Sequence, residues 1–378
     1  MNKSKTTTSR RKFLLAAGAG AAATAVAAPA VQAQSGPISM RFQSTWPSKD
    51  IFHEYALDFA KKVNDMTGGD LKIEVLPAGA VVPAFQLLDA VSKGLLDGGH
   101  GVLVYSYGKA TALALWGSGP AYAMDANMLL AWHKYGGGKQ LLEKLYASIG
   151  GNVVSFPYAP LYTQPLGWFK KVMEKPEDFK GLKYRTVGIS IDVFTGLGAA
   201  VNALPGGEIV PAMDRGLLDA AEFNNASSDR LLGFADVSKV CMLQSYHQNA
   251  EQFEVMFNKT KFDALPANIK AIIANAVEAA SADMSWKAVD RYSQDYIELQ
   301  TKDKVRFYKT PDSVLQKQLD GYDAAAAKKM ADNPMFKEIA ESQKKFAARA
   351  VRWDLDTNVS RRMAYNHYFA PKKPAKKA

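Results

Sequence analysis

The tetrapeptide Gly-Leu-Leu-Asp occurs twice in this chain, at 94–97 and again at 216–219. Each copy closes a stretch whose apolar residues recur at helical spacing, and each leads into a short stretch typical of a strand. His100 and Glu222 lie three residues beyond the first and the second copy. Because the tetrapeptide recurs together with its helix-to-strand context, the sequence favours two similar α/β lobes over a chance coincidence.

The rest of the apolar pattern also indicates an α/β fold. In the first half, the predicted strands are 39–46, 71–77 and 98–107, and the predicted helices are 53–66 and 81–97. This β-α-β-α-β order is typical of a mostly parallel sheet with helices on its faces. In the second half, we predict strands at 165–171, 181–188 and 220–223, and helices at 190–202 and 209–219. From residue 246 onward we expect helices, chiefly 265–303 and 313–353, with an interruption near Asn333 and Pro334.

Residues 1–33 have the features of a cleaved signal peptide. Basic residues that include Arg10 and Arg11 precede an apolar stretch rich in Ala and Gly, and small residues form an A-x-A-like cleavage site after Ala33. The paired arginines and the weakly apolar stretch indicate export by the twin-arginine route, so we expect a periplasmic protein. The alternative, an uncleaved membrane anchor, is disfavoured by the Ala and Gly content and by Pro29.

The net charge of +10 resides at the two ends of the chain. Five basic residues fall within 1–33 and four within 371–378, and neither segment contains an acidic residue, so the remainder carries about +1. Nucleic-acid binding needs a basic surface on the folded part of a protein, and the sequence therefore predicts no nucleic-acid partner. The lysine-rich residues 369–378 are expected to form a disordered tail.

The sequence contains no recognised motif for catalysis. A G-x-G-x-x-G after a strand, a P-loop, H-E-x-x-H, C-x-x-C and G-x-S-x-G are all absent. The single cysteine, Cys241, lies among apolar residues and is expected to be a buried, unreactive thiol. A binding protein is therefore favoured over an enzyme, although the twin-arginine route leaves open an exported enzyme that carries a cofactor.

Polar residues at predicted strand ends are the candidate site residues, because ligands of open α/β sheets bind beyond the carboxyl ends of the strands. Arg185 ends one strand and suits the carboxylate of a small organic acid, although an exposed surface arginine gives the same pattern. Glu222 and Asn224 end another strand, and Gln164 precedes a third. Their oxygens suit Na⁺ or Ca²⁺, unless these strand ends are merely solvated.

Other residues are candidates for the lining of a cleft between the lobes. The polar candidates are Tyr105, Tyr107, Tyr246, His247 and Gln248. At most one or two of the aromatic residues Trp46, Trp116, Trp168 and Phe169 are expected to touch a small ligand as an apolar wall, and the others to lie in the core.

Five motifs, taken in order, resemble the extracytoplasmic solute-binding proteins of tripartite ATP-independent periplasmic (TRAP) transporters. They are residues 67–100, GWF at 167–169, FKGLKYRTVG at 179–188, residues 204–222 and FNKTKFDALP at 257–266. The resemblance spans 38–352 and implies a periplasmic-binding-protein-like α/β fold, with two lobes around a ligand cleft and long interlobe and C-terminal helices. It places lobe I at 38–160 plus about 246–285, and lobe II with the C-terminal helices at 161–245 plus about 286–352.

The resemblance is greatest to the branch that binds 2-oxo or 2-hydroxy monocarboxylates, such as pyruvate or lactate, together with a metal ion. It implies that Arg185 binds the substrate carboxylate, and that Gln164, Glu222 and the backbone carbonyl of Phe223 hold Na⁺ or Ca²⁺. The branch often has Trp where this chain has Phe223, which alters the pocket wall while a backbone ligand tolerates the change. The resemblance also implies that Asn224, Tyr105 and Gln248 are pocket residues.

The same resemblance implies partners for the protein. It implies delivery of a small-molecule carboxylate to TRAP membrane subunits, and a homodimer formed through a C-terminal helix. No covalent chemistry is required, because ligand contacts to both lobes favour a closed state that membrane partners recognise. A sensory protein that passes closure to a receptor shares this fold and remains an alternative.

Overall fold

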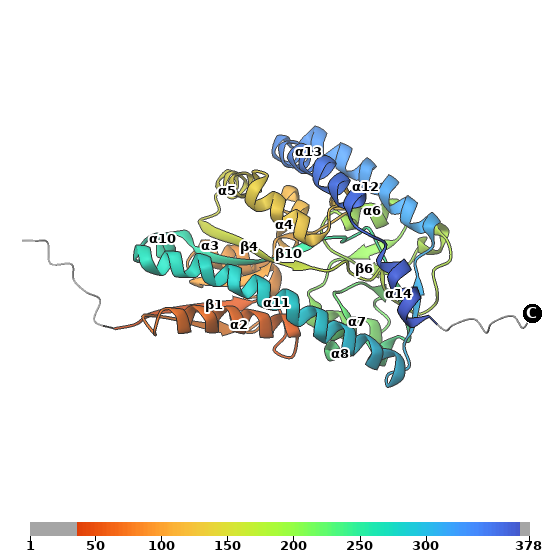
Figure 1. The fold of residues 1–378 in the computed structure, drawn as a ribbon, viewed down its shortest axis with the longest axis horizontal. Helices are drawn as coiled ribbons and strands as arrows, with labels where there is room; N and C mark the ends of the chain where they lie inside the picture. Colours follow the sequence, from red (N-terminus) through yellow and green to blue (C-terminus); the bar gives the residue numbers. More distant parts are fainter. Residues whose placement is uncertain (1–35, 371–378) are drawn as a thin grey trace, which may run out of the picture. The chain divides into compact units, whose positions relative to one another are not determined.

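The computed structural model describes residues 36–370, which contain two β-sheets and the helices packed around them (Figure 1). The first sheet has the order β2-β1-β3-β10-β4, with the bounds Leu71–Leu76, Ile38–Ser44, Gly98–Val102, Glu251–Asn258 and Val153–Leu161. Strand β1 is parallel to β2 and β3, whereas β10 is antiparallel to β3 and β4. The prediction of parallel strands is therefore correct for β1, β2 and β3. The sheet as a whole is mixed, because β10 pairs antiparallel with both of its neighbours.

The second sheet has the order β11-β9-β5-β8-β6-β7, with the bounds Arg306–Lys309, Val240–Leu243, Gly167–Phe169, Ala220–Ala221, Lys183–Arg185 and Ala200–Asn202. Strand β6 is parallel to β7 and β8, and β9 is parallel to β11, whereas β5 is antiparallel to β8 and β9. Strand β7 occupies the end of a segment that was predicted to be helical. The helix ends earlier because Gly198 has a φ of +87°, a left-handed conformation that interrupts a helix.

Long helices pack beside both sheets. Helix α11 (Ala267–Thr301) contacts α2 (Ile51–Met66) and β4 beside the first sheet, and α8 (Ala226–Leu232) beside the second. Helix α12 (Asp312–Asp332) contacts α6 (Ser190–Gly196), and α13 (Pro334–Thr357) contacts α4 (Ala126–Tyr135) and α5 (Gly138–Ser148). The remaining α-helices are α3 (Leu87–Ser92), α7 (Gly206–Asp214), α9 (Phe234–Val237), α10 (Lys259–Asp263) and α14 (Arg361–Phe369). The break near Asn333 is confirmed, whereas the predicted lobe boundaries stay a prediction.

The two Gly-Leu-Leu-Asp copies form the same turn. Helix α3 ends at Ser92 and α7 at Asp214, so each tetrapeptide follows its helix rather than closing it. Gly94 and Gly216 have φ angles of +77° and +71°, which suit glycine. In each copy the glycine N–H donates to the carbonyl three residues back, and the next N–H donates to the carbonyl five residues back. This is the Schellman arrangement of a helix end.

The aspartate of each copy ties the turn to a neighbouring strand. The Asp97 N–H donates to the carbonyl of Arg41, and the Asp97 side chain accepts the N–H of Arg41. Asp219 makes the same two hydrogen bonds with Lys183. The repeated tetrapeptide therefore serves one purpose in both sheets, which is to place the strand that follows it, β3 or β8, beside β1 or β6.

Strands β10 and β11 contradict the expectation that the chain is helical from residue 246. All residues of β10 are buried, including Glu251, Gln252 and Glu254. A strand that is covered on both faces has no alternation of apolar and polar residues, and buried polar residues disguise it further. The long apolar run that would have indicated such a strand is therefore missing from the sequence.

Replacing Glu254 by glutamine is expected to stabilise the protein at about pH 8 and to leave its stability unchanged near pH 4. Burial raises the pKa of Glu254 from 4.5 to about 7. The folded state then holds a proton that the unfolded state releases, so the free energy of unfolding of the wild type falls as pH rises between these values. Glutamine keeps the oxygen that accepts from Tyr146 and Ser155 without the charge.

Chemical denaturation at the two pH values measures this effect. We expect the variant to be more stable at about pH 8 by on the order of 1–3 kcal/mol. A difference between variant and wild type that is the same at both pH values would show that ionisation of Glu254 is not its cause.

Two predicted segments lie outside the described residues. These are the signal peptide at 1–33 and the tail from residue 371 onward. Helix α14 extends through Phe369, so the prediction of a disordered tail is wrong at this residue. Within residues 36–370, no helix is both long enough and apolar enough to cross a membrane.

Candidate functional site

The predicted binding residues line one small cavity that both sheets help to form. They are Tyr105, Gln164, Arg185, Glu222, Phe223, Asn224 and Gln248. Trp46 and Glu251 also line it. The cavity volume is about 10 Å³, which is roughly the room that one water molecule or one ion needs. The structure is therefore a closed form, in which the site has no space for an organic acid.

Strand ends bring the main polar residues together. Arg185 is the last residue of β6, and Glu222 follows β8 directly. Strands β6 and β8 are parallel neighbours, and the Glu222 N–H donates to the Arg185 carbonyl at 3.3 Å. Gln164 precedes β5, and its N–H donates to the carbonyl of Gln248 at 3.2 Å. These residues thus meet at the strand ends where α/β proteins bind their ligands.

Arg185 and Glu222 form a fully buried ion pair. Their side chains are 1% and 0% exposed, and the distance from Arg185 Nη1 to Glu222 Oε1 is 2.7 Å. Arg185 Nε also donates to the Leu204 carbonyl at 2.9 Å, while the Phe223 ring lies 5.6 Å from the guanidinium. Arg185 Nη2 has no hydrogen-bond partner among the described residues. The alternative of an exposed surface arginine is therefore excluded, and the Nη2 edge of the guanidinium is available to an anion.

Unpaired oxygen atoms gather around the same cavity. Among the described residues, the buried side-chain oxygens of the cavity lining that lack a hydrogen bond are Gln164 Oε1, Glu222 Oε2, Gln248 Oε1 and Glu251 Oε1. A buried polar atom without a partner costs about 1–3 kcal/mol, so such a cluster indicates a missing ligand. Carboxylate and amide oxygens are the ligands that Na⁺ and Ca²⁺ prefer. The residues present therefore fit a hard cation.

The orientation of Gln164 agrees with this interpretation. Its Nε2 donates to Glu251 Oε2 at 2.9 Å and to Asn224 Oδ1 at 3.3 Å. The two hydrogen bonds fix the amide group, so that Gln164 Oε1 is the atom left for a cation. Within residues 36–370, no group of three or more His, Cys, Asp or Glu side chains is arranged to hold a metal ion. A cation here would therefore depend on amide and backbone oxygens as well as on Glu222.

Glu251 is the site residue that the sequence reasoning missed. It lies at the start of β10, one of the strands that were not predicted. Burial raises its pKa, the nearby charge of Glu222 raises it further, and Arg185 partly offsets both effects. The sequence did contain a signal, because the segment 251–254 places two carboxylates and an amide beside Phe253. Charged residues are seldom fully buried unless they are paired or functional.

Some predicted cleft residues lie elsewhere. The Tyr107 hydroxyl donates to Asp192 Oδ2 at 2.5 Å beside a different cavity, and the Tyr246 N–H donates to Gln318. His247 Nε2 lies 3.8 Å from Glu222 Oε2, just behind the site. Tyr105 is on a 3-10 helix, Leu103–Ser106, rather than on a strand, because β3 ends at Val102.

The four aromatic candidates divide, as expected, into one that lines the small cavity and three that pack elsewhere. Of the four, Trp46 alone lines the cavity. Trp116 packs against Trp132 in the core, Trp168 contacts Phe234, and Phe169 stacks on Tyr184. Cys241 is buried, and burial raises the pKa of its thiol, so the thiol is held in its unreactive protonated form.

Comparison with known proteins identifies the family of this chain. Residues 42–332 match the model of the bacterial extracellular solute-binding proteins, family 7. The chain belongs to this family. Members of family 7 are solute-binding proteins rather than enzymes, which agrees with the absence of a catalytic motif. The predicted resemblance to TRAP solute-binding proteins is thereby confirmed.

Three relatives of this family 7 protein are informative. The monocarboxylate 2-oxoacid-binding periplasmic protein of Nostoc sp. is 32% identical over 86% of this chain and 88% of its own length. A TRAP solute-binding protein of Bordetella bronchiseptica, a dimer with calcium and picolinate, is 28% identical with a TM-score of 0.82 over 88% of this chain and 97% of its own. The TRAP solute-binding protein of Pseudoalteromonas atlantica, with sodium and pyruvate, is 28% identical to this chain. Its TM-score is 0.81, over 88% of this chain and 99% of its own.

Proposed function

We propose that this family 7 protein captures a 2-oxo or 2-hydroxy monocarboxylate together with Na⁺ or Ca²⁺ and delivers it to TRAP membrane subunits. The observation that carries the proposal is one buried cavity in which, among residues 36–370, the Arg185 Nη2 edge and four side-chain oxygens lack hydrogen-bond partners. In this role Arg185 binds the carboxylate, and Gln164, Glu222 and the Phe223 carbonyl hold the cation. Asn224, Tyr105 and Gln248 complete the pocket. The relatives from Nostoc and Pseudoalteromonas support this ligand class, and the Bordetella relative, with calcium and picolinate, supports a carboxylate bound together with a cation.

Charge balance explains why an acid needs a cation at this site. Arg185 and Glu222 already neutralise each other at 2.7 Å. An anion that entered alone would add an uncompensated charge to a buried site, which is costly. Na⁺ that enters with the acid restores the balance, whereas Ca²⁺ leaves one positive charge, which an ionised Glu251 in the cavity lining would offset; either cation also uses the unpaired oxygens. The acid and the cation are therefore expected to bind cooperatively.

Binding requires the protein to open and close. The cavity of about 10 Å³ cannot admit an acid, so the ligand must enter a more open form. Trp46 and Tyr105 contribute from the side of the first sheet, and Arg185 and Glu222 from the second. A ligand that contacts both sides favours closure, because all of its contacts form together only in the closed state. The closed form is then the one that the membrane subunits recognise.

A panel of small carboxylates tests this function. The melting temperature of purified protein is measured with pyruvate, lactate and non-acid controls, each with Ca²⁺, with Na⁺ and with chelator. We expect stabilisation by 2-oxo or 2-hydroxy acids that increases when the cation is supplied. No shift with any carboxylate would refute the ligand class, and a shift that is indifferent to cation and chelator would refute the metal.

We also propose that residues 1–33 direct export to the periplasm by the twin-arginine route. The paired Arg10 and Arg11 support it, as does the periplasmic location of the Nostoc relative. Replacing both arginines by lysine is expected to leave the precursor in the cytoplasm, as measured by cell fractionation. Unchanged export of the double variant would contradict the twin-arginine assignment and leave a general signal peptide.

A homodimer formed through α14 is the remaining part of the proposal. Helix α14 exposes Met363, Tyr365, Tyr368 and Phe369, each at least 62% exposed, which is unusual for a lone helix. A chain shortened after Asn358 is expected to be a monomer by light scattering, whereas removal of 371–378 alone should leave a dimer. The same mass per particle for both shortened chains would contradict this interface.

A further inference from the structure

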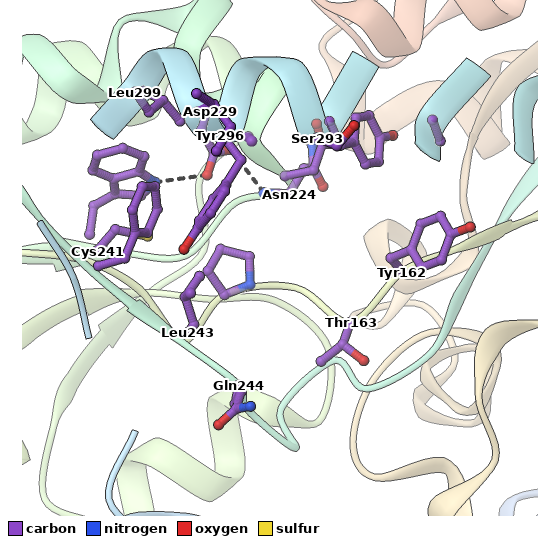
Figure 2. Close-up of a pocket in the computed structure, with 18 of the residues that line it drawn as sticks. Tyr162, Thr163, Asn224, Asp229, Cys241, Leu243, Gln244, Ser293, Tyr296 and Leu299 are labelled. Carbon is purple, nitrogen blue, oxygen red and sulfur yellow. Dashed lines mark hydrogen bonds between the residues drawn. The ribbon is translucent and has the colours of Figure 1, made fainter. Parts of the chain in front are cut away.

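A second, larger cavity shares a wall with the small one. Its volume is about 610 Å³, and it lies beneath α11, as Figure 2 shows. Asn224 lines both cavities, whereas Phe223 lines the small cavity and Asp229 lines the larger one. The peptide group that joins Phe223 to Asn224 therefore belongs to the wall between the two cavities.

The carboxylate of Asp229 holds one end of this peptide group. Asp229 Oδ1 accepts the Asn224 N–H at 3.1 Å, and Asp229 Oδ2 accepts the Trp168 Nε1–H at 2.7 Å (Figure 2). Asp229 is 1% exposed, and both of these donors are uncharged, so neither neutralises its charge. A carboxylate is costly to bury in this way, and charged residues are seldom fully buried unless they are paired or functional.

The ionised form of Asp229 is the form that fits its partners. A carboxylate accepts hydrogen bonds at both oxygens, whereas a protonated carboxyl would direct its own O–H at one of the two donors. Burial raises the pKa of Asp229 to about 7, the charge of Asp50 raises it further, and the hydrogen bonds from Trp168 and Asn224 lower it in part. Asp229 is therefore ionised at about pH 8.

Helix α8 presents Asp229 from a fixed position. The Asn225 side chain caps the helix by accepting the N–H groups of Ser227 and Ser228. The Ser228 hydroxyl donates to Asp50 Oδ1 at 2.7 Å, and Asp50 is itself the N-cap of α2 beside the first sheet. The helix that carries Asp229 is thus held from both sides of the molecule.

The other end of the same peptide group is the Phe223 carbonyl. Every described peptide bond is trans, and the N–H and C=O of a planar trans peptide group point in opposite directions. Because Asp229 holds the Asn224 N–H, the Phe223 carbonyl points away from Asp229. Hydrogen-bonded groups also polarise one another, so a negative charge at the N–H end makes the carbonyl oxygen more negative. A more negative oxygen is a better ligand for a hard cation.

We propose that Asp229 is a positioning residue for the cation site, an inference that rests on the proposed function. Asp229 touches neither the cation nor the acid. It fixes the peptide group between Phe223 and Asn224 so that the carbonyl oxygen faces the cation, and its buried negative charge strengthens that ligand. Groups that orient and polarise a metal ligand in this way typically contribute about 10- to 100-fold to the affinity for the metal.

Asp229→Asn tests this role, because asparagine keeps the shape of aspartate and loses its charge. Calorimetry at about pH 8 and saturating pyruvate measures the half-saturating concentration of Ca²⁺ and, separately, of Na⁺. We expect the variant to need at least about tenfold more of either cation than the wild type. Unchanged half-saturation would overturn the inference while the proposed function stands. A wild type that binds pyruvate without a cation, or not at all, would refute the proposed function and this inference with it.

Trp168→Phe is the matched control, because it removes the hydrogen bond to Asp229 Oδ2 and leaves the bond from Asn224 in place. We expect it to lower the melting temperature and to shift cation half-saturation by less than about threefold. Nuclear magnetic resonance of the cation-free protein gives a second readout, since a charged acceptor moves an amide proton downfield. The Asn224 amide resonance should move upfield in Asp229→Asn and little in Trp168→Phe. An equal loss of cation binding in both variants would show that the carboxylate only stabilises the fold, and would overturn the inference.

A double variant keeps the test decisive if Asp229→Asn folds poorly. Combining Asp229→Asn with Trp168→Phe removes the donor that the new amide group would oppose, and the amide oxygen can still accept the Asn224 N–H. We expect the double variant to bind either cation more weakly than Trp168→Phe alone, because the negative charge is missing. Equal cation binding by these two variants would overturn the inference.

Discussion

Arg185→Ala is expected to weaken the binding of every 2-oxo or 2-hydroxy acid by at least about 30-fold. Truncating one partner of a buried, hydrogen-bonded charge pair costs about 2–5 kcal/mol, and 1.4 kcal/mol corresponds to a factor of ten. Arg185 is 1% exposed, and water cannot replace the guanidinium. Its loss also leaves Glu222 buried without a countercharge, so the variant should be less stable.

The experiment needs a variant that separates binding from folding. Arg185→Lys keeps the positive charge but loses the planar fork, so we expect it to fold and still to bind more weakly by about tenfold or more. Arg230→Ala is the matched control, because Arg230 forms ion pairs with Asp295 and Asp303 on the partly exposed side of α8 and lines no cavity described above. Calorimetry that finds wild-type affinity in Arg185→Lys would remove Arg185 from the carboxylate site.

Glu222→Gln is expected to make acid binding weak and indifferent to the cation. Glu222 is 0% exposed, and its Oε2 has no hydrogen-bond partner among the described residues. Removing its negative charge therefore weakens the binding of a cation directly. Glutamine preserves the shape and can still accept from Arg185. We expect the affinity for pyruvate with Ca²⁺ or Na⁺ to fall at least about tenfold and chelator to have no further effect.

Glu254→Gln is the matched control for this experiment. Glu254 is also a buried glutamate, but it lies on β10 with hydrogen bonds to Tyr146 and Ser155, and it does not line the small cavity. The control should bind acid and cation like the wild type. Glu222→Ala, which removes the side chain altogether, should repeat the result of Glu222→Gln. Cation-dependent binding that persists in both Glu222 variants would rule out Glu222 as a ligand.

The sequence predicted the site better than the sheets that hold it. Arg185, Glu222 and Gln164 were recognisable because polar residues interrupt apolar stretches where a strand must end. The repeat at 94–97 and 216–219 was recognisable as the joint between a helix and a strand, although Gly94 and Gly216 form left-handed turns beyond the helices rather than their last residues. These signals are local, and they depend on neighbouring residues alone.

The missed features depend on contacts between distant parts of the chain. Strand β10 escaped prediction because Glu251 and Glu254 lie in a strand that is buried on both faces. Its antiparallel pairing with β3 joins residues more than 140 positions apart, which no local pattern reveals. Closure of the cavity around Arg185 likewise requires Trp46 from the first sheet. The sequence therefore predicts which residues can bind a ligand, and the structure reveals that they form one cavity.

A crystal structure of the protein grown with Ca²⁺ and a 2-oxo acid tests the central claim most directly. We expect the carboxylate on the Arg185 guanidinium and the cation on Gln164 Oε1, a Glu222 carboxylate oxygen and the Phe223 carbonyl. The small cavity must then be larger than the present 10 Å³. This account would be contradicted by an acid that binds instead in the cavity beneath α11. It would also be contradicted by an acid that binds beside an intact Arg185–Glu222 pair with no cation next to it.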